Sequence, residues 1–188
     1  MDSDEGSGVE QSVGDNRPYR VSFRLSEDDV PHAVYFLYFD ASGGALGKDV
    51  TLHDETGRLL FTNEPDKLPG LLRHGKKEFL ALGPPRDEPV VEHSVAWTVR
   101  LLSGKEPADR DDEAYCTLTM LCDCLATIDP DDRLGFRKVL GRGFSYLFEN
   151  GPRYSPEAYK DDDGDPEGLL RSFYGALGFV LCNARLVL

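Results

Sequence analysis

Three of the four cysteines of this chain lie close together, and thiols are the side chains here with the widest reactive chemistry. A thiolate can act as a nucleophile or as a zinc ligand. One residue separates Cys122 from Cys124, whereas the common zinc knuckle separates its cysteines by about two to four. No pair of histidines has zinc-finger spacing, so we expect no structural zinc. Because helical cysteines in apolar surroundings are inert, we expect reduced core residues at Cys116, Cys122, Cys124 and Cys182.

The segment 161–165 reads Asp-Asp-Asp-Gly-Asp, and carboxylates at alternate positions suit a hard cation such as calcium. An EF-hand loop that begins at Asp161 needs glycine at its sixth position and glutamate at its twelfth. Pro166 and Ser172 stand there instead, so the motif fails at both. We interpret the segment as a solvated acidic turn, and we expect neither a metal nor another cofactor.

The motifs of the familiar enzyme classes are missing from the sequence. It has no Gly-x-Ser-x-Gly elbow, and the glycine clusters at 42–44 and 141–143 match neither the Walker A pattern nor the dinucleotide fingerprint. No pair of carboxylates can be singled out as general acid and base. The histidines have no assignable partner: His32, His53, His74 and His93. The sequence therefore assigns no catalytic residue, and it favours a protein that is not an enzyme while leaving that question open.

The chain has a formal net charge of −13, from 34 acidic and 21 basic residues. This balance argues against direct nucleic-acid binding, for which a basic surface supplies most of the affinity. It favours solubility, and it would accelerate the encounter with a basic partner. We predict that the residues facing such a partner are Asp109, Asp111, Asp112, Asp129, Asp131, Asp132, Asp161, Asp162, Asp163 and Asp165.

These observations predict a small acidic protein-binding module that occludes a basic protein, in the manner of an inhibitor or an immunity protein. One alternative is an enzyme or small-molecule binder with a pocket between sheet and helices. Aromatic residues that could line such a pocket are Tyr35, Tyr38, Trp97 and Tyr115. The other alternative is a structural subunit of a larger assembly, in which the apolar residues 186–188 pack on another chain.

Residues 113–128 are the best candidate for a central helix that positions these groups. Apolar residues fall at i, i+3, i+4 and i+7, which is one face of a helix: Leu118, Leu121, Cys122 and Leu125. The segment ends at Asp129-Pro130, because the residue before a proline is disfavoured in the helical region. Residues 115–120 also alternate threonine with apolar residues, so a strand there remains an open alternative.

The part of the chain before this helix, residues 18–103, is rich in strand patterns. Strict alternation over 19–25 predicts a half-buried strand, and the aromatic run 33–39 predicts a central strand covered on both faces. A polar turn at 54–57 predicts a hairpin between 49–53 and 58–62. The remaining candidates are a short helix over 64–72 and strands over 78–82 and 90–102. We expect an antiparallel sheet of five or six strands.

The part that includes the central helix, residues 111–188, is rich in helix patterns. Apolar residues at helical spacing predict helices over 132–148 and from about 166 to 184, with a loop over 154–164. The apolar residues 186–188 predict a packed end, such as a last strand.

The predicted architecture is one α+β domain over residues 18–188, in which helices cover one face of the sheet. An acidic tail, residues 1–17, precedes it and is expected to be disordered. The sequence has no apolar run long enough to span a bilayer, and the N-terminal residues lack the pattern of a signal peptide. We therefore expect a cytoplasmic protein that does not bind membranes.

Overall fold

The computed structural model describes residues 16–26, 32–41, 46–105 and 111–188, and its centre is a four-stranded sheet. The strand order is β3 (Val50–Thr51), β2 (Ala33–Phe39), β1 (Tyr19–Arg24) and β5 (Val91–Ser94). β2 is antiparallel to β1 and β3, whereas β5 is parallel to β1. The fold is α+β as predicted, but the sheet is mixed and has four strands instead of five or six antiparallel ones.

Alternation along β1 and β2 sorts their side chains between the two faces of the sheet. On one face, Phe23 of β1 lies opposite Val34, and its ring centroid is 5.1 Å from that of Phe36. On the other face, Leu37 and Phe39 are buried in a second, smaller core. β2 is thus an internal strand with buried side chains on both faces, as its uninterrupted apolar run predicted.

A tight turn joins β3 to β4 (Leu59–Phe61), in agreement with the predicted hairpin. The carboxylate of Asp54 accepts hydrogen bonds from the backbone N–H groups of Thr56 and Arg58, at 2.9 and 3.1 Å. Gly57 has a φ of 82°, which glycine adopts without steric cost. β4 belongs to a separate two-stranded sheet, where it pairs in parallel with β6 (Ala184–Leu186). A last strand is present near the C-terminal end, but it covers Ala184–Leu186 and overlaps the predicted range 186–188 only at Leu186. The predicted packing of this end is wrong for Leu186 and Leu188, which are exposed.

The segment 90–102, predicted as one long strand, divides into β5 and helix α3 (Val95–Leu102). Ser94 stands at the break, where its Oγ accepts a hydrogen bond from the N–H of Trp97 at 3.2 Å and caps the helix. Thr98, Leu101 and Leu102 are buried at helical spacing. The β-branched residues favoured a strand, but packing of one helical face against the core overrides that propensity.

The segment 78–82, also predicted as a strand, overlaps the short helix α2 (Lys77–Leu80). An apolar run this short does not distinguish strand from helix, and here one helical turn buries Phe79. The short helix predicted over 64–72 is confirmed as α1 (Leu68–Leu71), which lies between the 3-10 turns η2 (Pro65–Lys67) and η3 (Leu72–His74). The segment from η2 to α2 covers the second face of the sheet. There the ring of Phe79, from α2, stacks on the ring of Phe39 of β2, with centroids 4.9 Å apart.

Three long helices form the main core with the first face of the sheet: α4 (Asp111–Ile128), α5 (Phe136–Asn150) and α7 (Pro166–Cys182). Each was predicted. α4 is helical throughout, so the strand alternative for 115–120 is wrong. Its threonines satisfy their hydroxyls within the helix, as when Thr119 donates to the carbonyl of Tyr115 at 3.0 Å. α5 begins at Phe136, later than predicted, because Asp132 and Gly135 adopt left-handed conformations.

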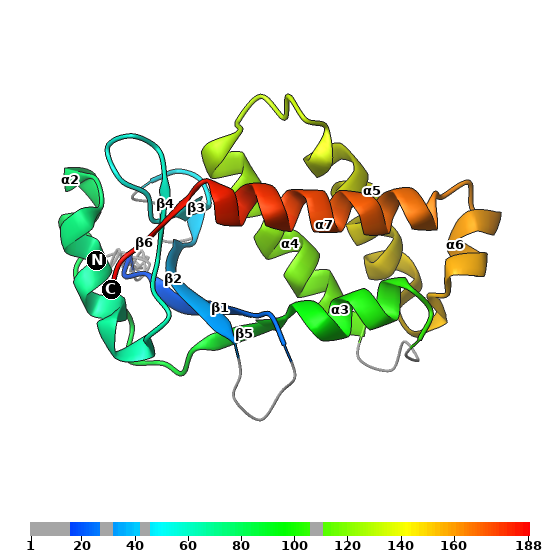
Figure 1. The fold of residues 1–188 in the computed structure, drawn as a ribbon, viewed down its shortest axis with the longest axis horizontal. Coiled ribbons are helices and arrows are strands. Elements are labelled where there is room, and N and C mark those ends of the chain that lie inside the picture. The colour runs from blue at the N-terminus through cyan, green and yellow to red at the C-terminus, as the bar shows by residue number, and fades with distance from the viewer. Residues whose placement is uncertain (1–15, 27–31, 42–45, 106–110) are drawn as a thin grey trace, which may run out of the picture.

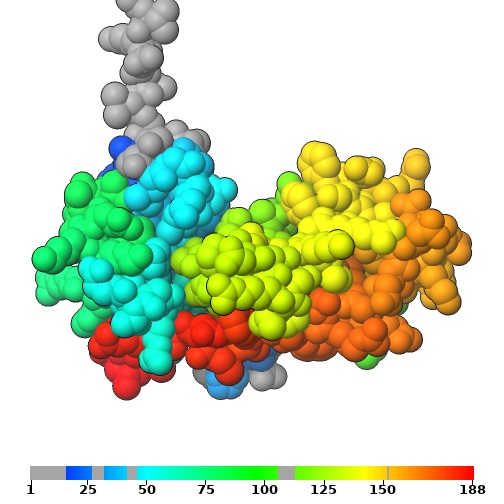
Figure 2. Space-filling model, turned by 90° about the horizontal axis from the view of Figure 1, so that it is seen from above, coloured from blue at the N-terminus to red at the C-terminus, as the bar shows by residue number. Residues whose placement is uncertain are grey.

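The segment 154–164, predicted as a loop, contains helix α6 (Pro156–Asp161), which follows the 3-10 turn η5 (Gly151–Arg153). Ser155 begins α6 by accepting the N–H of Ala158 at 3.0 Å. Figure 1 shows α6 at one end of the molecule and α2 at the other, with the long helices extending away from the sheet. In Figure 2 the residues from α4 onward likewise fill one side, and the red C-terminal segment reaches back beneath the cyan and green residues.

In the described ranges, every helix is too short or too polar to cross a membrane. The acidic tail predicted over residues 1–17 lies outside the described residues except for Asn16 and Arg17.

Candidate functional site

We predicted that the acidic residues after the end of α4 face a partner, but two of them accept hydrogen bonds from backbone N–H groups within the fold. Asp129 is buried, and its Oδ2 accepts the N–H of Leu134 at 3.4 Å. Asp132 accepts the N–H of Arg137 at 3.0 Å, which satisfies a backbone donor in the first turn of α5. Asp131 is exposed and forms a surface ion pair with a neighbouring arginine at 3.1 Å. Of these three carboxylates, Asp131 is thus the one that faces solvent.

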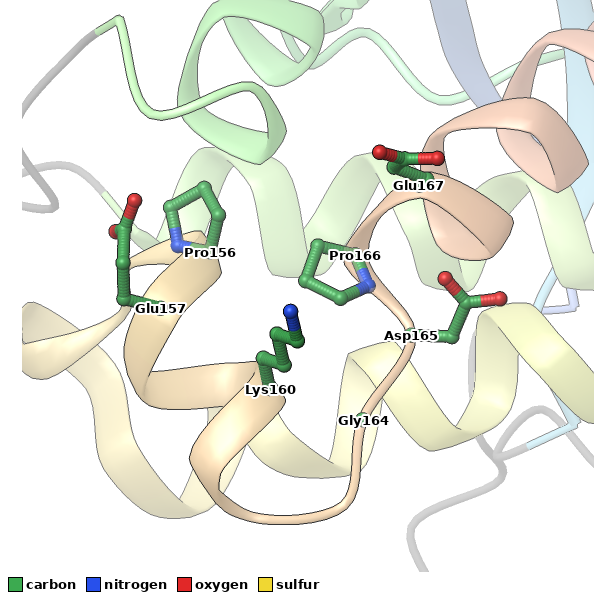
Figure 3. A pocket seen from close by; sticks show the side chains of 7 residues that line it. All are labelled: Pro156, Glu157, Lys160, Gly164, Asp165, Pro166 and Glu167. Carbon is green, nitrogen blue, oxygen red and sulfur yellow. The ribbon is translucent and has the colours of Figure 1, made fainter.

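The acidic cluster 161–165 lies between α6 and α7. All four aspartates of this cluster are exposed, and Asp165 also caps α7 by accepting the N–H of Gly168 at 2.8 Å. An open cavity of about 590 Å³ lies beside this cluster (Figure 3). In that view the Lys160 side chain is directed toward Pro166, whereas the Asp165 carboxylate is directed away from the cavity. Three carboxylates and one lysine line this cavity, and all four side chains are exposed, so solvent screens the charge that a ligand would meet there.

Two of the three remaining predicted acidic residues are at the start of α4. Asp109 lies outside the described residues, and Asp111 and Asp112 are the first two residues of the helix. Among the predicted partner-binding carboxylates whose side chains the structure describes, those exposed to solvent are Asp131, Asp161, Asp162, Asp163 and Asp165.

A cavity of about 290 Å³, lined mainly by apolar atoms, lies between the first face of the sheet and α4. We call it the sheet–helix pocket. Strands β1, β2 and β5 form one wall, and α4 forms the other. Its described lining residues are Tyr19, Val21, Tyr38, Asp40, Val91, His93, Tyr115, Cys116, Thr119, Met120 and Asp123. An apolar cavity with a few convergent polar groups is the usual form of a small-molecule site, and this volume lies near the lower limit of about 300 Å³.

His93 of β5 is the polar group buried most deeply in this lining. It is 4% exposed, and neither ring nitrogen has a hydrogen-bond partner among the described residues. Burial lowers the pKa of its imidazole to about 4, so the ring is neutral at pH 7 and offers one donor and one acceptor. An unpaired buried polar group costs about 1–3 kcal/mol, which a ligand bonded to the ring would offset.

Asp123 is the only acidic residue of α4 beyond its first turn, and it lies on the opposite wall from His93. The hydroxyl of Tyr38 donates a hydrogen bond to its Oδ2 at 3.1 Å. Burial raises the pKa of Asp123 to about 6; the Tyr38 hydrogen bond opposes this rise, and the nearby charge of Asp49 adds to it. Burial, followed by Asp123 and Asp49, raises the pKa of Tyr38, so its hydroxyl remains protonated. The pocket therefore holds a carboxylate whose charge is poorly solvated.

Aromatic rings make up much of the remaining lining and continue beyond it. The guanidinium of Arg86 lies over the ring of Tyr19, 3.7 Å from its centroid. Tyr115 stacks on Phe144 and Phe148, with centroids 4.5 and 5.5 Å away. Since Phe148 is 72% exposed, an apolar surface extends from the pocket onto α5.

The cysteines differ in exposure, which corrects the prediction that all four are core residues. Cys124 is buried and Cys122 half-buried, and burial raises the pKa of each thiol to about 12. Cys116 and Cys182 are exposed, and Cys116 is part of the pocket lining. In the described part of the chain, no three histidine, cysteine or acidic side chains form a group that could hold a metal ion.

Two of the four aromatic residues considered for such a pocket do line it, namely Tyr38 and Tyr115. Tyr35 packs on the smaller core at the other face of the sheet, and Trp97 is buried in the main core. Sequence reasoning did not single out His93 or Asp123. The sequence could have pointed to Asp123, since it is a carboxylate within an otherwise apolar helical stretch. No sequence pattern distinguishes His93 from the other histidines.

A second cavity, of about 410 Å³, lies near the C-terminal end of α4 and is lined partly by His53, Lys76 and Glu78. The Nδ1 of His53 lies 2.9 Å from the carbonyl oxygen of Thr51, and burial lowers the pKa of its ring. Acidic and basic residues are balanced in this lining, so it selects no ligand charge. The sheet–helix pocket is the more specific arrangement.

Comparison with known proteins finds no matching family model and no matching curated protein. The fold is similar to that of the SatS C-terminal domain, known from a crystal structure of that domain in complex with bromine. The two structures align with a TM-score of 0.52 at 14% sequence identity, over 91% of this chain and 93% of that chain. A likeness at this level of identity concerns the arrangement of helices and strands.

Proposed function

We propose that this protein is a small-molecule binder whose ligand occupies the sheet–helix pocket. The observation that carries the proposal is the imidazole of His93, which is buried in an apolar lining with no hydrogen-bond partner among the described residues. Proteins rarely leave such a group unpaired, because its lost hydration is not replaced. A ligand with an apolar body and one hydrogen-bonding group would fill the cavity and pair with the ring.

The test is a screen of small aromatic fragments, read by the imidazole resonances of the protein labelled at histidine. Fragments that enter the pocket will shift the His93 resonance before those of the exposed histidines His32 and His74. The variant Thr119→Phe fills the pocket from α4 and should abolish the shift. Ser145→Phe makes a similar enlargement at an exposed site on α5 and should retain it. The proposal fails if no fragment moves the resonance, or if Thr119→Phe binds as well as the native protein.

A second candidate function is the occlusion of a basic protein partner, in the manner of an inhibitor or immunity protein. The observation in its favour is that Asp161, Asp162 and Asp163 are exposed together and form no ion pair with the described residues. Together with the net charge of −13, such carboxylates would steer a basic protein toward this end of the molecule.

Charge reversal of these three aspartates to lysine tests the second candidate. The association rate with a captured basic partner should fall several-fold at low salt, and the difference should vanish at high salt. An unchanged rate at low salt would remove this cluster from any role in steering.

A third candidate is a structural subunit, and it is favoured by the exposure of the apolar C-terminal end. β6 pairs with β4, yet Leu186 and Leu188 remain exposed, the latter by 78%. A second chain packed on these leucines would bury them. Sedimentation of the native protein and of Leu188→Ser at micromolar concentration distinguishes a subunit contact from a monomer.

A further inference from the structure

We propose that the ligand of the sheet–helix pocket is a small organic amine, bound as a cation between the Asp123 carboxylate and the tyrosine rings. This inference rests on the proposed function and specifies its ligand class. An aryl- or alkylamine, with an ammonium group at one end and an apolar body at the other, has the matching distribution of charge and surface.

The charge of the lining indicates the sign of the ligand. The described lining residues include the carboxylic acids Asp40 and Asp123 and neither lysine nor arginine. Asp49 lies close enough to Asp123 and Tyr38 to act on both electrostatically. The nearby cation Arg86 lies over the ring of Tyr19, and its Nε donates to a backbone carbonyl. A cationic ligand would therefore be attracted to the Asp123 end of the pocket, and an anionic one repelled.

The hydrogen bonds of Asp123 leave room for an ammonium group. Tyr38 donates to Oδ2, whereas Oδ1 has no hydrogen-bond partner among the described residues. Carboxylates in desolvated sites form their strongest hydrogen bonds with charged donors. An ammonium group at Oδ1 would supply such a donor and would neutralise the buried charge.

The aromatic lining supplies a second kind of cation recognition. The rings of Tyr38 and Tyr115 line the same cavity, whereas one face of the Tyr19 ring is already covered by the Arg86 guanidinium. The faces of such rings attract cations through their quadrupoles, most strongly where water is excluded. The apolar residues Val21, Val91 and Met120 provide the surface for the body of the amine. The neutral His93 ring adds an acceptor for an N–H or O–H of the ligand.

The experiment compares three probes of nearly equal size on the full chain at pH 7.5: phenethylamine, phenethyl alcohol and 3-phenylpropanoate. Titration with each is followed by calorimetry and by the His93 imidazole resonance. The amine should bind about tenfold more tightly than the alcohol, because a hydrogen bond to a charged group is worth that factor or more. The carboxylate should bind more weakly than the alcohol.

The substitution Asp123→Asn should remove the preference for the amine, so that the amine and the alcohol bind with similar affinity. Asp131→Asn, at an exposed site outside the pocket, is the matched control and should keep the preference. Equal binding of amine and alcohol by the native protein would overturn the inference while the proposed pocket function stands. Binding of none of the three probes would overturn the inference, and the fragment screen described above would then decide the proposed function separately. An amine preference that survives Asp123→Asn would also overturn the inference, since the assigned carboxylate would not be its source.

Discussion

The hydroxyl of Tyr38 donates a hydrogen bond to Oδ2 of Asp123 across 3.1 Å, and this contact joins the internal strand β2 to helix α4 over 85 positions of sequence. Burial raises the pKa of both side chains. At neutral pH the phenol is therefore neutral, and the carboxylate carries a charge in a site that disfavours it. Carboxylates with pKa values raised by burial in a cavity are typical of binding and catalytic sites.

The first prediction is that Asp123→Asn stabilises the fold at pH 8 by on the order of 1 kcal/mol, a value reduced for partial solvent screening. The folded pKa of about 6 exceeds the ordinary 3.8, so the folded state binds the extra proton between these values. Stability from this group is therefore greatest below about pH 4 and is lost as pH rises through about 6. Urea unfolding at pH 8 and pH 4.5 measures the effect, which should be smaller at the lower pH. An equal loss of stability at both would mean that the hydrogen bond from Tyr38 outweighs the charge.

The second prediction concerns the pH dependence of amine binding. The affinity for phenethylamine should fall by about tenfold between pH 7.5 and pH 5, as Asp123 takes up a proton while the amine stays charged. The affinity for phenethyl alcohol should stay constant, because no charge pair forms. The other ionisable groups of the lining or adjoining it are Tyr19, Tyr38, Asp40, Asp49, His93, Tyr115 and Cys116. Measuring the same pH dependence in Asp123→Asn shows whether Asp123 is its source. A pH dependence of phenethylamine affinity that persists in this variant must come from one of the other ionisable groups just named.

The third prediction separates two glycines of the same helix. A Cβ at Gly143 would lie 2.6 Å from Cδ1 of the fully buried Leu169, where α5 and α7 approach closely. Gly143→Ala should therefore destabilise the fold by about 1–3 kcal/mol. A Cβ at Gly141 meets nothing within 4 Å, so Gly141→Ala should stabilise it by about 0.5–1 kcal/mol through helix propensity. Thermal unfolding of both variants makes the comparison, and similar changes of the same sign would contradict the close packing of α5 on α7.

The fourth prediction is a selective pattern of thiol alkylation. Iodoacetamide should modify Cys116 and Cys182 in the native protein, because both are exposed. Cys124 should react after unfolding, since it is buried and its pKa is raised to about 12. Peptide mass spectrometry over time gives the order of reaction. Phenethylamine should slow the modification of Cys116 and leave that of Cys182 unchanged, because Cys116 lines the pocket.

Local patterns were sufficient for the elements whose periodicity is long and regular. The helical spacing of Leu118, Leu121 and Leu125 predicted α4, and strict alternation predicted β1. Short or β-branched segments were misjudged, as in α2 and α3. In α3 the choice between helix and strand depends on the N-cap at Ser94, and in α2 it depends on burial of Phe79 against the sheet. Neither contact can be predicted from the periodicity of apolar residues.

The sequence by itself determined the α+β class, the order of its main elements and the acidic charge, because these depend on composition and on spacing between near neighbours. The tertiary structure alone decided which residues share a site. Parallel pairing of β5 with β1 brings His93 to the same face as Tyr38, and packing of α4 on that face adds Asp123. Contacts between residues so distant in sequence follow from closure of the whole core, which leaves no local pattern to read.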